Sequence, residues 1–165
     1  MRDLEPPDIH FLSAALGWIE LGLPGEAHVE LARLSPRARS HADVLSVEWN
    51  LCEHENRWQD ALDVACRIVE IDRDRCTGWI NRSYALHALR RTAEASAALI
   101  PAVALFPSNG LIPYNLACYA CQLNRLPEAR QWLRKAMALD GRDTVLLRAR
   151  SDNDLEPMLA ELETL

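Results

Sequence analysis

Apolar and small residues recur along this chain with a period of 34 positions. An acidic residue followed directly by alanine lies at 26–27, 60–61, 94–95 and 128–129. Four residues after each alanine come Leu31, Ala65, Leu99 and Leu133, and seven after come Leu34, Ile68, Ala102 and Ala136. These spacings place the side chains on one stripe of an α-helix. Three residues further on, the same stripe is expected to continue through Ile71, Leu105 and Leu139.

A second helix is predicted before each acid-alanine pair. Sixteen residues before the alanines stand Phe11, Leu45, Trp79 and Pro113, and nine before stand Trp18, Cys52, Leu86 and Ala120. Short polar or breaker segments separate the two helices, at 22–25, 55–57, 90–92 and 124–127. Pro24 and Pro127 fit the first turn of a helix, where the missing N–H has no partner to lose. Each period therefore holds two helices.

The recurring acid has a structural explanation. It falls in the first turn of the second helix, near the positive end of the helix dipole, which contributes about 0.3–1 kcal/mol. We interpret it as part of the scaffold. In the first period Pro36 should end the second helix about one turn early.

The layout resembles the tetratricopeptide repeat (TPR) over residues 8–141. The resemblance is strongest in the last two periods, in the series Trp79, Leu86, Ala95, Leu99, Ala102, Pro107 and the series Leu116, Ala117, Ala120, Ala129, Leu133, Ala136, Leu139. It implies an all-α fold, a right-handed α-solenoid of four TPR-like helix-turn-helix repeats, because a single repeat cannot bury its apolar face alone. We expect one domain of 165 residues with repeats at 8–41, 42–75, 76–109 and 110–143.

The segment 144–165 departs from the period. Its apolar residues Leu155, Met158, Leu159 and Leu162 share one face at helical spacing. Asp152 or Asn153 is a suitable N-cap, with Glu156 in the first turn. We predict a capping helix that closes the open end of the solenoid, with a partner-binding helix as the alternative.

The resemblance also indicates which positions line the concave groove. Among them, the partner-binding candidates are Ser46, Asn50, Glu53, His54, Asn81, Tyr84, His87, Tyr114, Asn115 and Cys118. Asn81 and Asn115 occupy equivalent positions in adjacent repeats, and Asn50 lies on the same face. An asparagine amide both donates and accepts, so it can bind the backbone of an extended peptide regardless of its sequence. Incidental exposure of these polar residues is the alternative.

The same positions in the first repeat are mostly apolar: Leu12, Ser13, Leu16, Ile19 and Glu20, with Ile9 one turn earlier. Three roles remain open for this face. It can take up a hydrophobic anchor of a partner, form a homodimer with a second copy of the chain, or be covered by the chain's own residues 1–7.

Five cysteines, an odd number, favour reduced thiols. Cys118 and Cys121 have the C-x-x-C spacing of redox and metal sites, yet no second cysteine pair or nearby histidine pair completes a zinc set. We expect neither metal nor cofactor, and interpret the pair as small helical residues. Only an approach of His54 and His87 to this pair would favour a site.

Glu48 and Arg82 lie thirteen residues before their respective alanines. Equal offsets in adjacent repeats place them on facing helices. We therefore predict an ion pair between repeats, with a structural role.

A formal charge of −6 argues against a nucleic-acid surface. No apolar run approaches the roughly 18 residues of a membrane span, and residues 1–7 lack a signal-peptide pattern. We expect a cytoplasmic location. The excess of arginine over the single Lys135 suggests a GC-rich, bacterial genome. Sequence motifs for phosphate binding, zinc proteases and nucleophile elbows are missing, so we do not expect an enzyme.

Together these features predict a protein-protein interaction module that binds a peptide or partner segment in its groove. Two alternatives stay open. One is an export or assembly chaperone, because the small acidic TPR chaperones of type III secretion are similar in size and repeat content. The other is a structural subunit that assembles with itself through the apolar first repeat.

Overall fold

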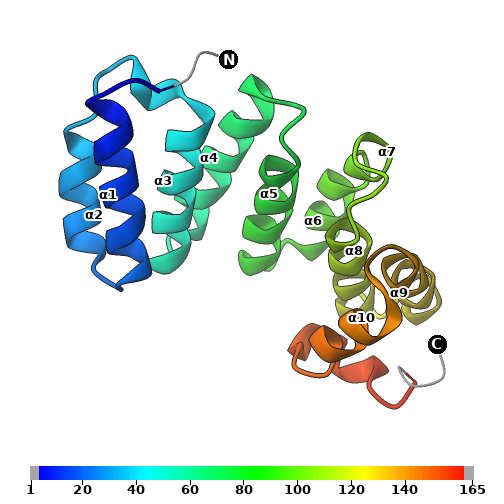
Figure 1. Cartoon of the computed structure of the whole chain (residues 1–165). Helices are drawn as coiled ribbons and strands as arrows, with labels where there is room; N and C mark the ends of the chain where they lie inside the picture. Colours follow the sequence, from blue (N-terminus) through cyan, green and yellow to red (C-terminus); the bar gives the residue numbers. More distant parts are fainter. Residues whose placement is uncertain (1–3, 162–165) are drawn as a thin grey trace. The chain divides into compact units, whose positions relative to one another are not determined.

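The computed structural model describes residues 4–161, which form helices joined by short turns (Figure 1). Ten α-helices and two short 3₁₀ helices, η1 and η2, occur in this part of the chain, and it contains no β-strand. The predicted all-α class is confirmed. None of the helices within residues 4–161 has the length and apolar character that a membrane crossing needs.

The helices form consecutive pairs along the chain, each with a first and a second member. The first members are α1 (Asp8–Glu20), α3 (Ala42–His54), α5 (Cys76–Ala88) and α8 (Leu111–Gln122). The second members are α2 (Pro24–Ala32), α4 (Trp58–Ile71), α6 (Thr92–Leu99) with the short α7 (Ala102–Leu105), and α9 (Leu126–Asp140). The remaining elements are η1 (Ala38–Ser40), α10 (Arg142–Ala149) and η2 (Asn153–Met158).

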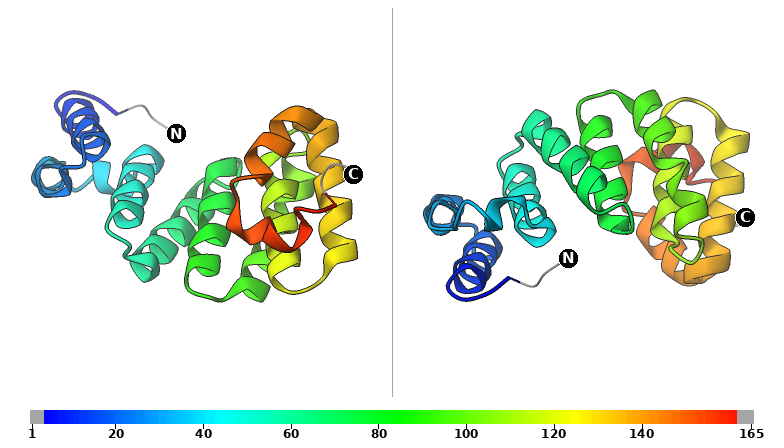
Figure 2. Two further views of the ribbon diagram at one scale, coloured as in Figure 1. Left: turned by 90° about the horizontal axis from the view of Figure 1, so that it is seen from below. Right: turned by 90° about the horizontal axis from the view of Figure 1, so that it is seen from above.

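The chain divides into two compact units, the first ending at Asn81 and the second beginning at Arg82 within α5. In the first unit α1 packs against α2, and α3 against α4. In the second unit α8 packs against α9 and against η2, and α10 packs against α9. Figure 2 shows the orange and red C-terminal elements lying against the helices of this second unit. The single domain predicted from the sequence stays a prediction.

One turn geometry recurs between the helices of each pair. Gly22, Asn56, Arg90 and Asn124, spaced by 34 positions, all have left-handed backbone, with φ of 71°, 56°, 63° and 57°. The following residue in each case donates its N–H to the carbonyl five positions back, at 2.8–2.9 Å. This is the Schellman termination, which satisfies carbonyls that a helix end would leave without partners.

The recurring acids lie near the start of the second helices, as predicted. Glu26, Asp60, Glu94 and Glu128 each lie in the first turn of α2, α4, α6 and α9. Three of them have a further role that the periodicity did not reveal. Each pairs with an arginine three residues earlier, in Arg57–Asp60 at 2.7 Å, Arg91–Glu94 at 2.7 Å and Arg125–Glu128 at 3.8 Å.

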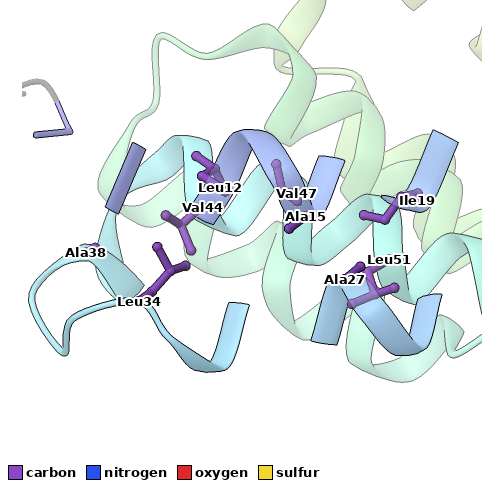
Figure 3. Close-up of a cluster of buried hydrophobic side chains, with 9 residues drawn as sticks. All are labelled: Leu12, Ala15, Ile19, Ala27, Leu34, Ala38, Val44, Val47 and Leu51. Carbon is purple, nitrogen blue, oxygen red and sulfur yellow. The ribbon is translucent and has the colours of Figure 1, made fainter. Parts of the chain in front are cut away.

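The alanines of the 34-residue pattern lie at the centre of the packing. Ala27, Ala61, Ala95 and Ala129 are all 0% exposed. In the first unit Ala27 belongs to a cluster of apolar side chains from α1, α2, η1 and α3 (Figure 3). Small residues at these positions let neighbouring helices approach closely, so we expect larger side chains to be excluded there.

Two expectations about the second helices have different outcomes. The early end before Pro36 is confirmed, because α2 stops at Ala32 after nine residues. The continued apolar stripe is wrong, because Ile71, Leu105 and Leu139 are 46%, 51% and 39% exposed. Ile71 is the last residue of α4, and Leu105 ends α7, which is separate from α6. Leu139 is the last residue but one of α9, so all three side chains lie where a helix ends.

The C-terminal segment forms η2 instead of a full α-helix. The predicted N-cap is confirmed at Asp152, whose side chain accepts from the N–H of Asp154 at 3.0 Å. Leu155 and Met158 are 0% and 1% exposed, whereas Leu159 is 40% exposed. Leu162 lies outside the described residues.

Candidate functional site

The first unit contains four of the predicted groove residues on α3. Ser46 is half-buried and its Oγ donates to the carbonyl of Ala42 at 2.8 Å, so its hydroxyl is used within the helix. Glu53 is half-buried, and this burial raises the pKa of its carboxyl group. His54 is exposed at the end of the helix. Asn50 is half-buried, and its amide makes no hydrogen bond within the described part of the chain.

The next predicted positions lie on α5. Asn81 is half-buried, and its side chain also makes no hydrogen bond among the described residues. Tyr84 is 43% exposed. His87 is bound on both sides of its ring, because Nε2 is 2.9 Å from Asp154 Oδ2 and Nδ1 is 3.0 Å from Thr92 Oγ1. A carboxylate only accepts, so Nε2 carries the proton and donates to Asp154.

On α8 the predicted positions differ sharply in exposure. Asn115 is half-buried, with an amide that again has no hydrogen bond within residues 4–161. Tyr114 and Cys118 are only 2% and 4% exposed. Tyr114 Oη donates to Asp152 Oδ2 at 2.8 Å, and Cys118 Sγ donates to the same oxygen at 3.5 Å. The chain's own C-terminal segment thus covers these two residues.

Further contacts fix this segment on the second unit. Gln122 Nε2 donates to the carbonyl of Asp154 at 3.0 Å. Arg130 of α9 binds the carboxylate of Glu161 with two hydrogen bonds, at 2.6 and 2.8 Å. Just before this segment, Arg148 of α10 places its guanidinium carbon 4.9 Å from the centre of the Tyr114 ring. Its Nη1 is 3.9 Å from Oδ2 of Asp140 in α9. Acidic side chains of the segment therefore meet donors on α5, α8 and α9.

A buried polar contact that the sequence did not suggest supports this face. The hydroxyl groups of Ser83 and Tyr119 are 3.1 Å apart, and both residues are buried. The ring of His87 lies beside that of Tyr119, with centroids 5.0 Å apart. Burial raises the pKa of Tyr119 well above its usual value, so the phenol stays protonated. The repeat pattern assigns no polar pair to these positions, so only the fold brings the two together.

The C-x-x-C pair lies in the same region and is unsuited to thiolate chemistry. Both thiols are buried, and this burial, together with nearby Asp152 and Asp154, raises the pKa of Cys118 and that of Cys121. All five cysteines are free. Residues 4–161 contain no group of three or more histidine, cysteine, aspartate or glutamate side chains placed to hold a metal ion. His87 faces Asp154 and Thr92.

The apolar face predicted for the first repeat is smaller than expected. Leu12 and Ile19 are each 8% exposed, because they turn into the cluster of Figure 3 and pack with residues of α3. The prediction that Leu12 and Ile19 line a groove surface is therefore wrong. Ile9 and Leu16 remain outside, 41% and 36% exposed. Leu4 packs against the cluster, in line with partial cover by the N-terminal residues.

The predicted ion pair between Glu48 and Arg82 stays a prediction, since the two residues belong to different units. Arg82 Nη2 donates to the carbonyl of Ala98 at 2.9 Å. Glu48 lines a pocket of about 360 Å³ in the first unit, and burial raises the pKa of its carboxyl group. Arg39 and Arg57 also line this pocket.

Comparison with solved structures finds the same architecture elsewhere. A MamA double mutant from RS-1 is 17% identical, with a TM-score of 0.73 over 98% of this chain and 93% of that one. MamA from MSR-1 is 21% identical, with a TM-score of 0.68 over 81% and 76% of the two chains. A thermophilic TPR protein of Thermus thermophilus is 20% identical, with a TM-score of 0.68 over 97% and 83%.

No protein-family model and no curated protein sequence matches the chain. At these identities the structural likeness concerns the fold. The helix pairs, the 34-residue period and the solved neighbours together establish that the chain has the all-α fold of tetratricopeptide-repeat solenoids.

Proposed function

We propose that the chain is a protein-interaction module without catalytic activity, which binds peptide or partner segments along the groove faces of its first helices. One observation carries the proposal. Asn50, Asn81 and Asn115 are half-buried, and their amides make no hydrogen bond among the described residues. Because these amides are not used within the fold and are still reached by water, the backbone of a bound segment can replace that water without breaking an internal hydrogen bond.

Each asparagine suits the backbone of a bound segment. Its carbonyl oxygen accepts from a peptide N–H and its NH₂ donates to a peptide carbonyl, so recognition does not depend on the sequence of the partner. The exposed ring of Tyr84, three residues after Asn81, adds flat contact area at low entropic cost. Glu53 and His54 are then the polar residues at the end of α3 that a partner reaches.

Recovery of partners from a cell lysate tests this proposal. The immobilised full chain is compared with the double variant Asn81→Ala plus Asn115→Ala, and captured proteins are quantified by mass spectrometry. The control is Gln59→Ala plus Gln131→Ala, which removes two exposed amides from α4 and α9. We expect the asparagine variant to lose most of the specific partners and the glutamine variant to keep them. Equal recovery by all three proteins would refute the role of the asparagines.

A further inference from the structure

The acidic C-terminal segment occupies a face of the second unit that presents hydrogen-bond donors. We call it the acid-binding face and define it by His87, Tyr114, Cys118 and Gln122. These side chains bind the segment at Asp152 and Asp154, through the two carboxylates and one backbone carbonyl. Three of these residues, His87, Tyr114 and Cys118, stand at positions that the sequence predicts for partner contact, and residues of the chain itself fill that place.

We propose that the acid-binding face is a recognition site for an acidic segment of a partner protein, and that residues 152–158 occupy it until such a segment replaces them. The partner segment carries two carboxylates two residues apart, followed by an apolar residue, as in Asp152, Asp154 and Leu155. This inference rests on the proposed function, because it takes the chain to be an interaction module, and it adds the chemistry of one partner.

The contacts explain why the face selects acids. A hydroxyl and a thiol converge on one oxygen of Asp152, and an imidazole N–H donates to Asp154. Bonds from donors to an ionised carboxylate are stronger than bonds between neutral groups. Both oxygens of Asp152 accept hydrogen bonds, so an amide there would turn one acceptor into a donor that faces another donor. An amide at position 154 would remove the charge that faces His87.

The apolar residue supplies the second half of recognition. Leu155 and Met158, both part of the segment, have almost fully buried side chains. The helix that carries them, η2, contains only six residues. A 3₁₀ helix of this length has little stability of its own, so contacts with the acid-binding face hold it in place. A competing segment can replace η2 by making the same contacts through its own two carboxylates and apolar residue.

Fluorescence anisotropy with a synthetic peptide tests the proposal on the full chain. The probe is a labelled peptide with the sequence of residues 150–161. The chain is compared with its variant Asp152→Asn plus Asp154→Asn, in which the internal segment is weakened while asparagine still caps η2. We expect the variant to bind the peptide at least ten-fold more tightly than the wild type, because its own segment competes less well.

Two controls make the result specific. Glu156→Gln removes an exposed carboxylate from the same segment, and it should leave peptide affinity at the wild-type value. A peptide with asparagine at both aspartate positions should bind the double variant at least ten-fold more weakly than the acidic peptide. If the double variant loses helical circular dichroism, the single variant Asp154→Asn, which keeps the cap at Asp152, replaces it with the same expectation.

The face itself is tested by Tyr114→Phe in the background of the double variant. The ring stays buried and only the hydroxyl donor is lost, so peptide binding should weaken several-fold without loss of helix. Equal affinity of the acidic and amide peptides, or of wild type and double variant, would overturn the inference. If the peptide assays fail while partner recovery still depends on Asn81 and Asn115, the inference falls and the proposed function stands.

Discussion

Asp8 illustrates how a single side chain can join separate elements. It begins α1, and its two oxygens accept from the backbone N–H of Ser35 at 2.8 Å and from the Ser35 hydroxyl at 2.7 Å. These bonds tie the first helix to the loop that follows the second. The backbone hydrogen bond and then the hydroxyl hold the pKa of Asp8 below its usual value.

The depressed pKa makes the contribution of Asp8 dependent on pH. A carboxylate whose pKa is lower in the folded state stabilises the fold above its unfolded pKa of about 3.9, and the effect is lost as pH falls through the folded value. We therefore expect Asp8→Ala to lower the Tm at pH 7, with the gap to wild type narrowing as the pH falls below about 3.9. Circular dichroism melts at pH 7 and at a series of acidic pH values measure this gap. The exposed Glu20→Ala on the same helix is the control, and a gap independent of pH would contradict the assignment.

At the scale of elements, the packing of α4 against the start of α5 depends on a glycine. A Cβ added to Gly78 would lie 2.7 Å from Ile68 Cγ2 and 3.3 Å from Val69 Cγ2. Ile68 is 0% exposed and cannot move aside. The absence of a side chain at this position therefore sets how closely the two helices approach.

Two glycine substitutions should change stability in opposite directions. Gly78→Ala forces the helices apart and should lower the free energy of unfolding by about 1–3 kcal/mol. Gly17→Ala meets no atom within 4 Å in α1, and it should raise the free energy of unfolding by about 0.5–1 kcal/mol. Urea denaturation of both variants provides the measurement. A stabilising Gly78→Ala would show that α4 and α5 are less tightly packed than described.

The recurring left-handed turns differ in how well their residues fit them. Glycine at 22 has no Cβ, and the short polar side chains of Asn56 and Asn124 can hydrogen-bond the local backbone, so these residue types tolerate positive φ. Arg90 has a Cβ, and arginine is not a residue type that commonly adopts this conformation. We expect Arg90→Gly to raise the free energy of unfolding by about 1 kcal/mol. Asn124→Gly, the matched change one repeat later, should alter it by less than about 0.5 kcal/mol. Denaturant titrations measure the free energy of unfolding of both variants. A lower value for Arg90→Gly than for wild type would mean that the arginine side chain stabilises the fold.

These elements also indicate what the sequence can and cannot predict. The acids at the helix starts and the early end of α2 were predictable, because each depends on residues within one or two turns. The burial of Leu12 and Ile19 was not, since it depends on how α3 packs against α1. The cover over Tyr114 and Cys118 was hidden for the same reason, because Asp152 lies 38 and 34 residues further on.

At the scale of the whole molecule, the corrected apolar face of α1 bears on self-assembly. Only Ile9 and Leu16 of that face remain exposed, at 41% and 36%. A stable dimer usually buries about 800 Å² on each partner, which two side chains do not provide. The formal charge of −6 adds repulsion between copies.

We therefore expect the chain to be a monomer in solution. Light scattering coupled to gel filtration should give a mass of 18.6 kDa that does not change over a hundred-fold range of concentration. A mass that rises toward the dimer value would instead favour the homodimer. The variant Ile9→Ser plus Leu16→Ser would then show whether α1 forms the interface.

The placement of η2 also determines when the acid-binding face is open. Chains are synthesised from the N-terminus, so the four residues of the face are made before the residues that cover them. His87 precedes its partner Asp154 by 67 residues, and α8 ends at Gln122, well before η2 begins at Asn153. Until residues 152–158 have been made and have packed against the second unit, a partner that recognises the face competes with no internal segment.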